Sequence, residues 1–184
     1  MKKGNIFTYV LRLSLTLLAI TAFVALALAG INSLTAEAIA NNKLAKEQAA
    51  MEQVLPGAEN LESVPFTDAS GIVRKVYACE TGYVVEVAPA GFGGAISMMV
   101  GILPDGTVKD IAIVSHTETA GLGAVAAADN AAGSDFRVQF SGTDGNLAVD
   151  KDGGSIDSIT GATITSRAVT EGVNAALAAV AGLQ

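Results

Sequence analysis

The feature that most constrains the fold is an uninterrupted apolar run near the N-terminus. Residues 13–36 contain no charged side chain, and the stretch 13–31 consists mainly of Leu, Ala, Ile, Val and Phe. A helix of about twenty apolar residues is long enough to cross the hydrocarbon core of a bilayer. The run therefore predicts one transmembrane helix, and the remainder of the chain must fold beside a membrane.

The charges around this run predict its orientation. Lys2, Lys3 and Arg12 precede it, and Glu37 is the first charge after it. Positive charges favour the cytoplasmic side, so we expect a single-pass protein of the cell (inner) membrane, with a cytoplasmic N-terminus and residues 32–184 on the extracytoplasmic face.

A cleaved signal peptide is the alternative interpretation of the same run. Ala25-Leu-Ala27 and Ala27-Leu-Ala29 resemble small-residue cleavage sites. The apolar core of a signal peptide is, however, only about 7 to 15 residues long, and this run is longer. We therefore favour a retained anchor.

Composition excludes several classes of function. Eleven basic and eighteen acidic residues give a formal net charge of −7, which argues against nucleic acid as a partner. Cys79 and His116 are the only Cys and His, so neither an intramolecular disulfide nor a zinc site built from several such residues can form within the chain. Asp144, Asp150 and Asp152 match a calcium loop only in part, and we assign no metal. Cys79 is interpreted as a buried thiol.

The rest of the chain predicts a helical stalk followed by an α+β domain. Residues 34–55 have a sparse apolar edge among charges, and Pro56-Gly57 ends that helix. Val- and Tyr-rich runs predict a mainly antiparallel sheet with flanking helices. The expected strands are 72–78, 82–88, 95–103, 107–115, 136–140 and 156–159, and the expected helices are 124–132 and one beginning near 166. The expected domains are 1–33 (cytoplasmic N-terminus and anchor), 34–63 (stalk and linker) and 64–184 (globular domain).

A cluster of hydroxyl side chains precedes the last helix. Thr160, Thr163, Thr165 and Ser166 surround a Gly-Ala pair, and an amphipathic helical pattern follows. Free backbone N–H groups and the helix dipole favour an anion at such a position, most naturally a phosphate. An ordinary N-cap formed by Thr165 or Ser166 is the alternative.

A second unusual stretch is the loop 115–123, in which polar residues are followed by two glycines around Leu122. Glycines allow the backbone to approach another group closely, so Leu122 could rest against a flat apolar ligand. A purely structural turn explains the same residues. On residue chemistry alone the two interpretations stay open.

These two stretches carry a resemblance to the FMN-binding domain family. Asp157-Ser-Ile-Thr-Gly-Ala-Thr163 resembles its flavinylation signature, in which the last Thr is esterified by the phosphate of FMN. His116-Thr-Glu-Thr-Ala-Gly-Leu-Gly123 is similar to a second motif, with Ala120 where a proline is usual. The resemblance implies covalent FMN on Thr163 and recognition of Asp157 by a flavin transferase. It also implies that Thr165 and Ser166 contact the flavin on the phosphate side and that Thr119, Gly121, Leu122 and Gly123 line the isoalloxazine. The other cofactor-binding residues that it implies are Thr160, Gly161 and Ala162.

The order of the parts is most similar to that of the G subunits of Rnf-type ion-translocating electron transport complexes, which are related to the C subunits of sodium-translocating NADH:quinone reductases. The resemblance implies an electron-carrying subunit with other membrane subunits as partners and without catalytic residues of its own. A standalone membrane-anchored flavoprotein for extracellular electron transfer shares every motif. A pilin-like structural protein shares only the apolar helix and the outer domain.

Overall fold

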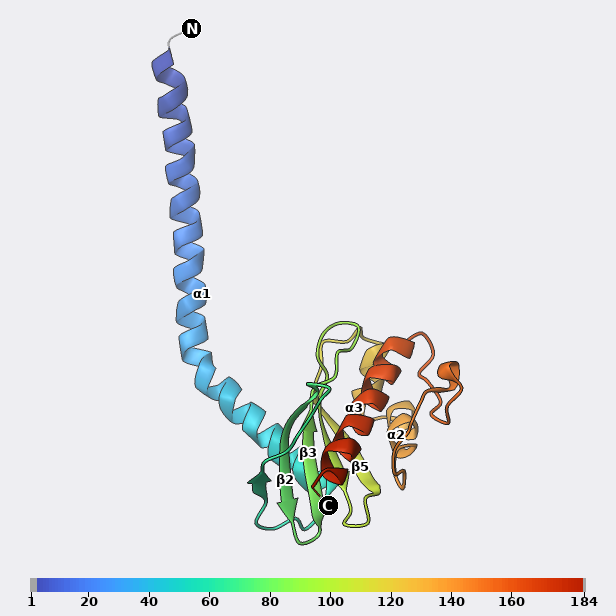
Figure 1. Cartoon of the computed structure of the whole chain (residues 1–184). Helices are drawn as coiled ribbons and strands as arrows, with labels where there is room; N and C mark the ends of the chain where they lie inside the picture. The colour runs from blue at the N-terminus through green and yellow to red at the C-terminus, as the bar shows by residue number, and fades with distance from the viewer. Residues whose placement is uncertain (1–2, 184) are drawn as a thin grey trace. The chain divides into compact units, whose positions relative to one another are not determined.

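A computed structural model describes residues 3–183 (Figure 1). Lys2, one of the charges before the apolar run, lies outside this range. The chain divides into two compact units, residues 1–45 and 46–184, which are described separately. The elements are α1 (Lys3–Val54), β1 (Glu62–Val64), β2 (Val73–Cys79), β3 (Gly82–Val87), β4 (Ser97–Ile102), β5 (Val108–Ser115), the short 3₁₀ helix η1 (Gly123–Ala127), α2 (Ala131–Val138), the 3₁₀ helix η2 (Asp150–Asp152) and α3 (Thr163–Ala181).

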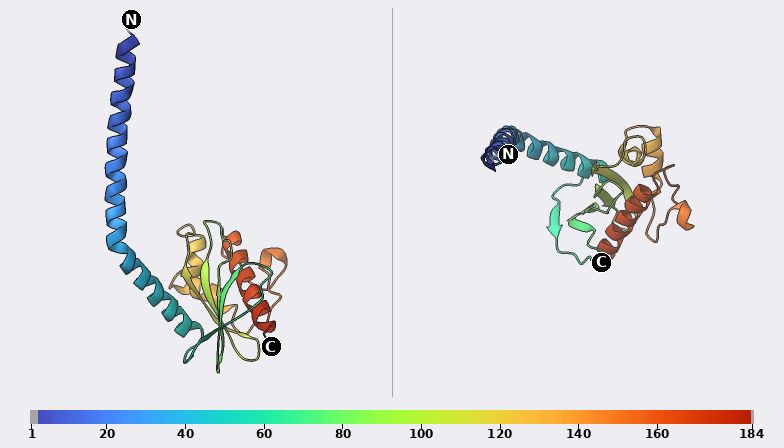
Figure 2. Two further views of the ribbon diagram at one scale, coloured as in Figure 1. Left: turned by 60° about the vertical axis from the view of Figure 1, so that its left-hand side comes forward. Right: turned by 90° about the horizontal axis from the view of Figure 1, so that it is seen from above.

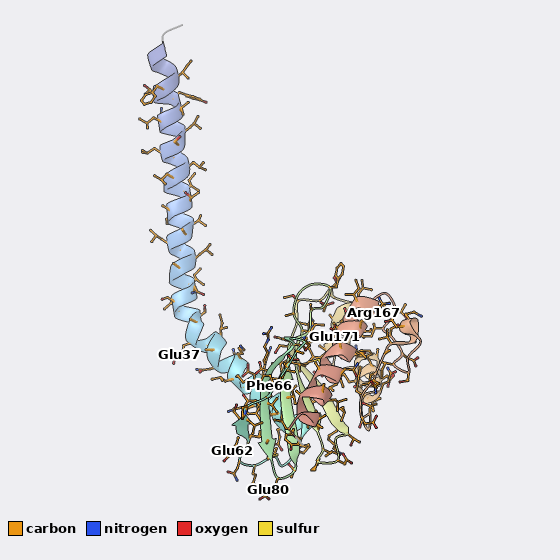
Figure 3. All side chains as sticks on the ribbon, viewed as in Figure 1. Glu37, Glu62, Phe66, Glu80, Arg167 and Glu171 are labelled. Carbon is orange, nitrogen blue, oxygen red and sulfur yellow. The ribbon has the colours of Figure 1, made fainter. Side chains whose placement is uncertain are left out.

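The first unit is the N-terminal part of α1. Its large apolar side chains are exposed along the whole length, from Ile6 through Phe23 to Leu34, and they project on all sides of the helix (Figure 3). A helix that is apolar all round is typical of a membrane span. The helix is long and apolar enough to cross a bilayer, as its sequence predicts.

The second unit is built on a five-stranded antiparallel sheet in which every strand pairs with its neighbour in the sequence, in the order β1-β2-β3-β4-β5. The predicted hairpins between 72 and 115 are confirmed. The turn between β4 and β5 is closed by a 2.9 Å hydrogen bond from the Gly106 N–H to the Leu103 carbonyl, and Gly106 has a positive φ of 86°. This is the conformation that glycine adopts without strain.

The two faces of the sheet are covered by different helices (Figures 1 and 2). Because successive strand residues point to opposite faces, Val85 and Val100 belong to the main core with α3. Val84 and Met99 belong to a smaller core with the last turns of α1, including Val54. The α+β class with flanking helices is therefore confirmed.

The last turns of α1 end as the sequence predicts. The helix stops at Val54, one residue before the expected end, and Gly57 follows with a positive φ of 74°. Cys79 differs from expectation. It is half-buried at the end of β2, with its Sγ 3.2 Å from Thr81 Oγ1.

Three predictions of secondary structure after β5 are wrong. Residues 136–140 are not a strand, because α2 begins at Ala131 and runs through Val138. The N-cap of this helix is Asn130, whose side chain accepts the Gly133 N–H at 2.9 Å. Phe136 and Phe140 are buried four residues apart, as on one helix face, whereas Val138 is exposed. The expected helix 124–132 is split between η1 and the start of α2. The expected strand 156–159 is reduced to a single bridge between Val149 and Ile156.

Candidate functional site

A cavity of about 340 Å³ lies where three segments meet: the loop between β3 and β4, the loop between β5 and η1, and the first turn of α3. Its volume is within the range of about 300 to 1,000 Å³ that small-molecule sites occupy. The two motifs singled out from the sequence, more than thirty residues apart, contribute to the same cavity. The lining residues are Phe92, Glu118, Thr119, Leu122, Gly123, Gly161, Ala162, Thr163, Ile164 and Thr165.

The first turn of α3 begins three residues earlier than the sequence predicts. Its first residue is Thr163, and the preceding Ala162 provides no side-chain cap. The interpretation of Thr165 or Ser166 as an ordinary N-cap is therefore wrong. Thr163 is partly exposed at the rim of the cavity, and the N–H groups of the first helical turn have no acceptor within the helix. A hydroxyl and free N–H groups thus meet at the positive end of the helix dipole.

Thr165 and Ser166 are engaged inside the protein. The Thr165 hydroxyl, in a residue that is only 2 % exposed, donates to Glu118 Oε2. Ser166 is fully buried, and its Oγ donates to the Ala162 carbonyl at 3.1 Å and accepts the Ile159 N–H at 3.0 Å. Among the four hydroxyl residues of the cluster, Thr163 therefore combines contact with the cavity and access to solvent.

Glu118 is the buried charge at the centre of the site, and sequence reasoning did not assign it a role. Its residue is 9 % exposed, its Oε1 accepts the Gly93 N–H at 2.8 Å, and its Oε2 accepts the Thr165 hydroxyl. A buried carboxylate that accepts hydrogen bonds from two different segments holds them together. The sequence signal that could have identified Glu118 as a site residue is its position in the second motif, between the polar residues and the two glycines.

The two motifs touch each other through glycines. A Cβ on Gly123 would lie less than 3.0 Å from Thr165 Oγ1 and from Glu118 Oε2, so only glycine allows this approach. A Cβ on Gly161 would lie 3.1 Å from a methyl group of Leu122. Leu122 and Gly161 are thus neighbours, and the Leu122 side chain remains 43 % exposed at the cavity.

The turn that presents Leu122 has an identifiable type. The Leu122 N–H donates to the Thr119 carbonyl at 3.1 Å, and Gly121 has a positive φ of 76°. These are the features of a type II turn with Ala120 at its second position, where proline is common. Ala120 therefore stands at the turn position where the second motif usually has a proline, which would fix the φ angle of the turn.

The segment before α3 is held by side chains rather than by a strand. Three consecutive backbone N–H groups each have a side-chain acceptor. Asp157 donates to Gln139 Oε1 at 2.6 Å, Ser158 donates to Asp150 Oδ1 at 3.0 Å, and Ile159 donates to Ser166 Oγ. Gln139 completes the pair by donating to the Asp157 carbonyl at 3.3 Å. The segment is therefore ordered up to the turn that leads into Thr163.

Not every residue expected at the flavin lies in the 340 Å³ cavity. Gly121 and Thr160 line a neighbouring cavity of about 510 Å³, together with Asp157. Ser166 lines neither of these two cavities and lies in the core. Phe92 and Ile164, which sequence reasoning did not single out, do line the first cavity. Both are exposed apolar side chains, a property that gives no signal in the sequence.

One ion pair and one backbone hydrogen bond hold the acidic loop before this segment. Arg167, labelled on α3 in Figure 3, donates from Nε and Nη2 to the two carboxylate oxygens of Asp152, each at 2.6 Å. These hydrogen bonds lower the pKa of Asp152. Hydrogen bonds from Ser158 and Lys151 lower the pKa of Asp150. The carboxylates of the loop are thus used to attach it to α3 and to residue 158.

The chemistry of the first cavity fits a flat apolar molecule that carries an anionic group. Phe92, Leu122 and Ile164 supply exposed apolar surface around it. The first turn of α3 supplies N–H donors at Thr163, suitable for a phosphate. Among residues 3–183, no group of three or more His, Cys, Asp or Glu side chains is placed to hold a metal ion.

Comparison with known proteins assigns the chain to a class. Residues 91–178 match the sequence model of the FMN-binding domain. The matched region begins in the loop that carries Phe92 and ends within α3, so it includes every segment that lines the cavity. The segments that line the cavity thus belong to an FMN-binding domain.

Curated relatives narrow the class. The G subunit of the Na(+)-translocating ferredoxin:NAD(+) oxidoreductase complex of Acetobacterium woodii is 34 % identical over 186 residues, which cover 90 % of this chain and 88 % of that protein. The G subunit of the ion-translocating oxidoreductase complex of Yersinia pestis is 37 % identical over 80 % of this chain and 79 % of that protein. The G subunit of the proton-translocating ferredoxin:NAD(+) oxidoreductase complex of Clostridium ljungdahlii is 46 % identical over 55 % of this chain and 57 % of that protein. The chain belongs to the family of G subunits of ion-translocating oxidoreductase complexes.

Proposed function

We propose that this chain is the membrane-anchored, electron-carrying subunit of a redox-driven ion-translocating complex of the Rnf type, with FMN joined through its phosphate to Thr163. The observation that carries the proposal is the meeting of both motifs in one cavity, with the partly exposed Thr163 in its lining. Bound FMN supplies the one- and two-electron chemistry, and the protein supplies position and electrostatics.

The residues of the site divide the work of holding the cofactor. Thr163 is the attachment point, and the N–H groups of the first turn of α3 receive the charge of the phosphodiester. Leu122 and Gly123 form the apolar wall, and Glu118 fixes that wall to α3 through Thr165. We assign Thr165 a positioning role rather than a direct contact with the phosphate, because its hydroxyl already donates to Glu118.

Attachment requires a flavin transferase as a partner during maturation. The transfer forms a bond between Thr163 Oγ and the phosphorus of the FMN moiety of FAD, breaks the pyrophosphate bond, and releases AMP. Asp157 is exposed and directly follows Ile156, which forms the bridge to Val149, and its backbone is held by Gln139. We assign Asp157 to recognition by the transferase, since a carboxylate cannot attract the phosphate by charge.

Covalent attachment is useful if the domain lies on the extracytoplasmic face, as the charges around α1 favour. A tethered cofactor stays at an effective concentration on the order of millimolar, whereas a dissociated flavin would be lost by diffusion. The remaining subunits of the complex are the partners of this chain in the membrane. A standalone flavoprotein would instead purify without them, so purification from native membranes separates the two functions.

The attachment site is tested with single substitutions in a host that contains a flavin transferase. Thr163→Ala should abolish the in-gel fluorescence of the denatured chain, and Thr163→Ser should retain it because the hydroxyl remains. Thr67→Ala is the control, since Thr67 is an exposed threonine outside both motifs and should leave the fluorescence unchanged. Fluorescence that persists in Thr163→Ala would show that another residue carries the flavin. Mass spectrometry of a peptide spanning 152–167 should show the added mass of FMN less water.

A further inference from the structure

The side chain of Phe92 is 69 % exposed, yet it lies at the tip of a loop that is held firmly in place. The loop joins β3 to β4 and contributes Phe92 to the lining of the flavin cavity. A single exposed apolar residue needs no explanation on a protein surface. Phe92 is a different case, because its ring lies beside a ligand cavity and its backbone is held in place although the ring itself is not buried.

Three hydrogen bonds maintain that position. The Gly93 N–H donates to Glu118 Oε1 at 2.8 Å, the Thr117 hydroxyl donates to the Gly93 carbonyl at 2.9 Å, and the Gly91 N–H donates to the Gly94 carbonyl at 2.8 Å. A Cβ on Gly93 would collide with the backbone of Thr117, so the two loops are in direct contact. A ring on such a loop loses little conformational freedom when a ligand packs against it.

The proposed attachment point indicates which part of the cofactor would lie beside Phe92. Attachment through Thr163 keeps the phosphate at the first turn of α3. The rest of the cavity is lined from the two loops by Phe92 and Leu122, and Glu118 holds the Phe92 loop from inside the same cavity. The uncharged ring system therefore extends toward these apolar side chains.

We propose that Phe92 forms one wall of the flavin site, packing against the isoalloxazine ring and separating it from bulk solvent, with Glu118 as the positioning residue that holds this wall. The inference rests on the proposed function. Aromatic rings pack favourably against flat π-systems in offset or edge-to-face arrangements. The role of Phe92 is thus to limit access to the flavin on the extracytoplasmic face, where small oxidants and water are abundant.

The test uses the full chain carrying covalent flavin, so that occupancy does not depend on Phe92. Quenching of flavin fluorescence by iodide measures how accessible the ring system is. Phe92→Ala should raise the quenching constant toward that of free FMN in the same buffer, and Phe92→Leu should give an intermediate value. Val138→Ala is the matched control, since Val138 is an exposed apolar residue outside the lining of the cavity, and it should leave the constant unchanged.

Glu118 is tested by the same readout. Glu118→Ala should raise the quenching constant as Phe92→Ala does, although it leaves the phenyl ring in place, and Glu118→Gln should restore part of the protection because its amide oxygen can still accept the Gly93 N–H. Combining Phe92→Ala with Glu118→Ala should add little. A loaded Phe92→Ala variant with the wild-type quenching constant would overturn the inference and leave the proposed function standing. A wild-type chain without covalent flavin would overturn the proposed function itself.

Discussion

The contact between the two motifs predicts that Gly123→Ala is strongly destabilising. The new methyl group would lie less than 3.0 Å from Thr165 Oγ1 and Glu118 Oε2, which are hydrogen-bonded to each other. Both atoms are in buried residues, so they have little room to move. Losing a hydrogen bond to a charged group costs about 1.5 to 3 kcal/mol, and overpacking a core costs about 1 to 3 kcal/mol. We expect the free energy of unfolding to fall by about 3 kcal/mol.

Thermal unfolding of the full chain in detergent measures this loss, which for a domain of this size lowers Tm by on the order of 10 °C. Gly121→Ala is the matched control. Gly121 has a positive φ but nothing within 4 Å of the position that an added methyl group would take, so this change should cost only the backbone strain of about 1 to 2 kcal/mol. The clash argument would be refuted if Gly123→Ala were no more destabilising than Gly121→Ala.

A double-mutant cycle tests the origin of the loss. Thr165→Ala removes one of the two atoms that the new methyl group meets and frees the carboxylate of Glu118 to move away. The loss in free energy of unfolding of the combined variant should therefore be smaller, by about 1 kcal/mol, than the sum of the losses of the two single variants. A coupling of this size is typical of residues in contact. Simple additivity would mean that Gly123 acts through the backbone alone.

Two further predictions concern the loops around the site. Ala120→Pro should raise the free energy of unfolding by about 0.4 to 1 kcal/mol, because Ala120 is the second residue of a type II turn, where the fixed φ of proline fits. Denaturant titration measures this gain, and a loss of stability would contradict the type II assignment. The pKa of Asp152 is lowered by its hydrogen bonds to Arg167, so the stabilisation by this pair is present above the unfolded-state pKa of about 3.9 and is lost as the pH falls through the lower folded-state value. The protection factors of amides around residue 152, which are corrected for the intrinsic pH dependence of exchange, should therefore fall below about pH 4 in the wild type, and Asp152→Asn should abolish that loss of protection.

The sheet and the apolar N-terminal helix could be predicted from the sequence because their signals are local. Alternating apolar residues and the Pro104-Asp-Gly106 turn specify the hairpin of β4 and β5, and an apolar run specifies the first part of α1. The segment with Phe136 and Phe140 misled because residues four apart share a face in both a strand and a helix. The deciding signal was Asn130, a helix-capping residue six positions earlier.

The candidate site was predictable only in its motifs. Thr163, Leu122 and Gly123 lie together as the resemblance implies, because short motifs carry their own backbone requirements. Glu118 and Phe92 were not identified as site residues, since their roles arise from contacts between distant loops. Ser166 was expected to face the phosphate and is instead buried, because α3 begins at Thr163 and turns its side chain toward Ile159.

The neighbour-to-neighbour order of the sheet separates the folding of the scaffold from the assembly of the site. Every strand pairs with the next strand in the sequence, so the sheet can form through local contacts, which are reached quickly. The contacts that close the site span longer stretches, 25 residues between Gly93 and Glu118 and 47 between Glu118 and Thr165. Substitutions at Glu118 or Thr165 should accordingly speed unfolding while leaving the folding rate nearly unchanged. The chain can thus vary its cofactor environment without slowing the formation of its sheet.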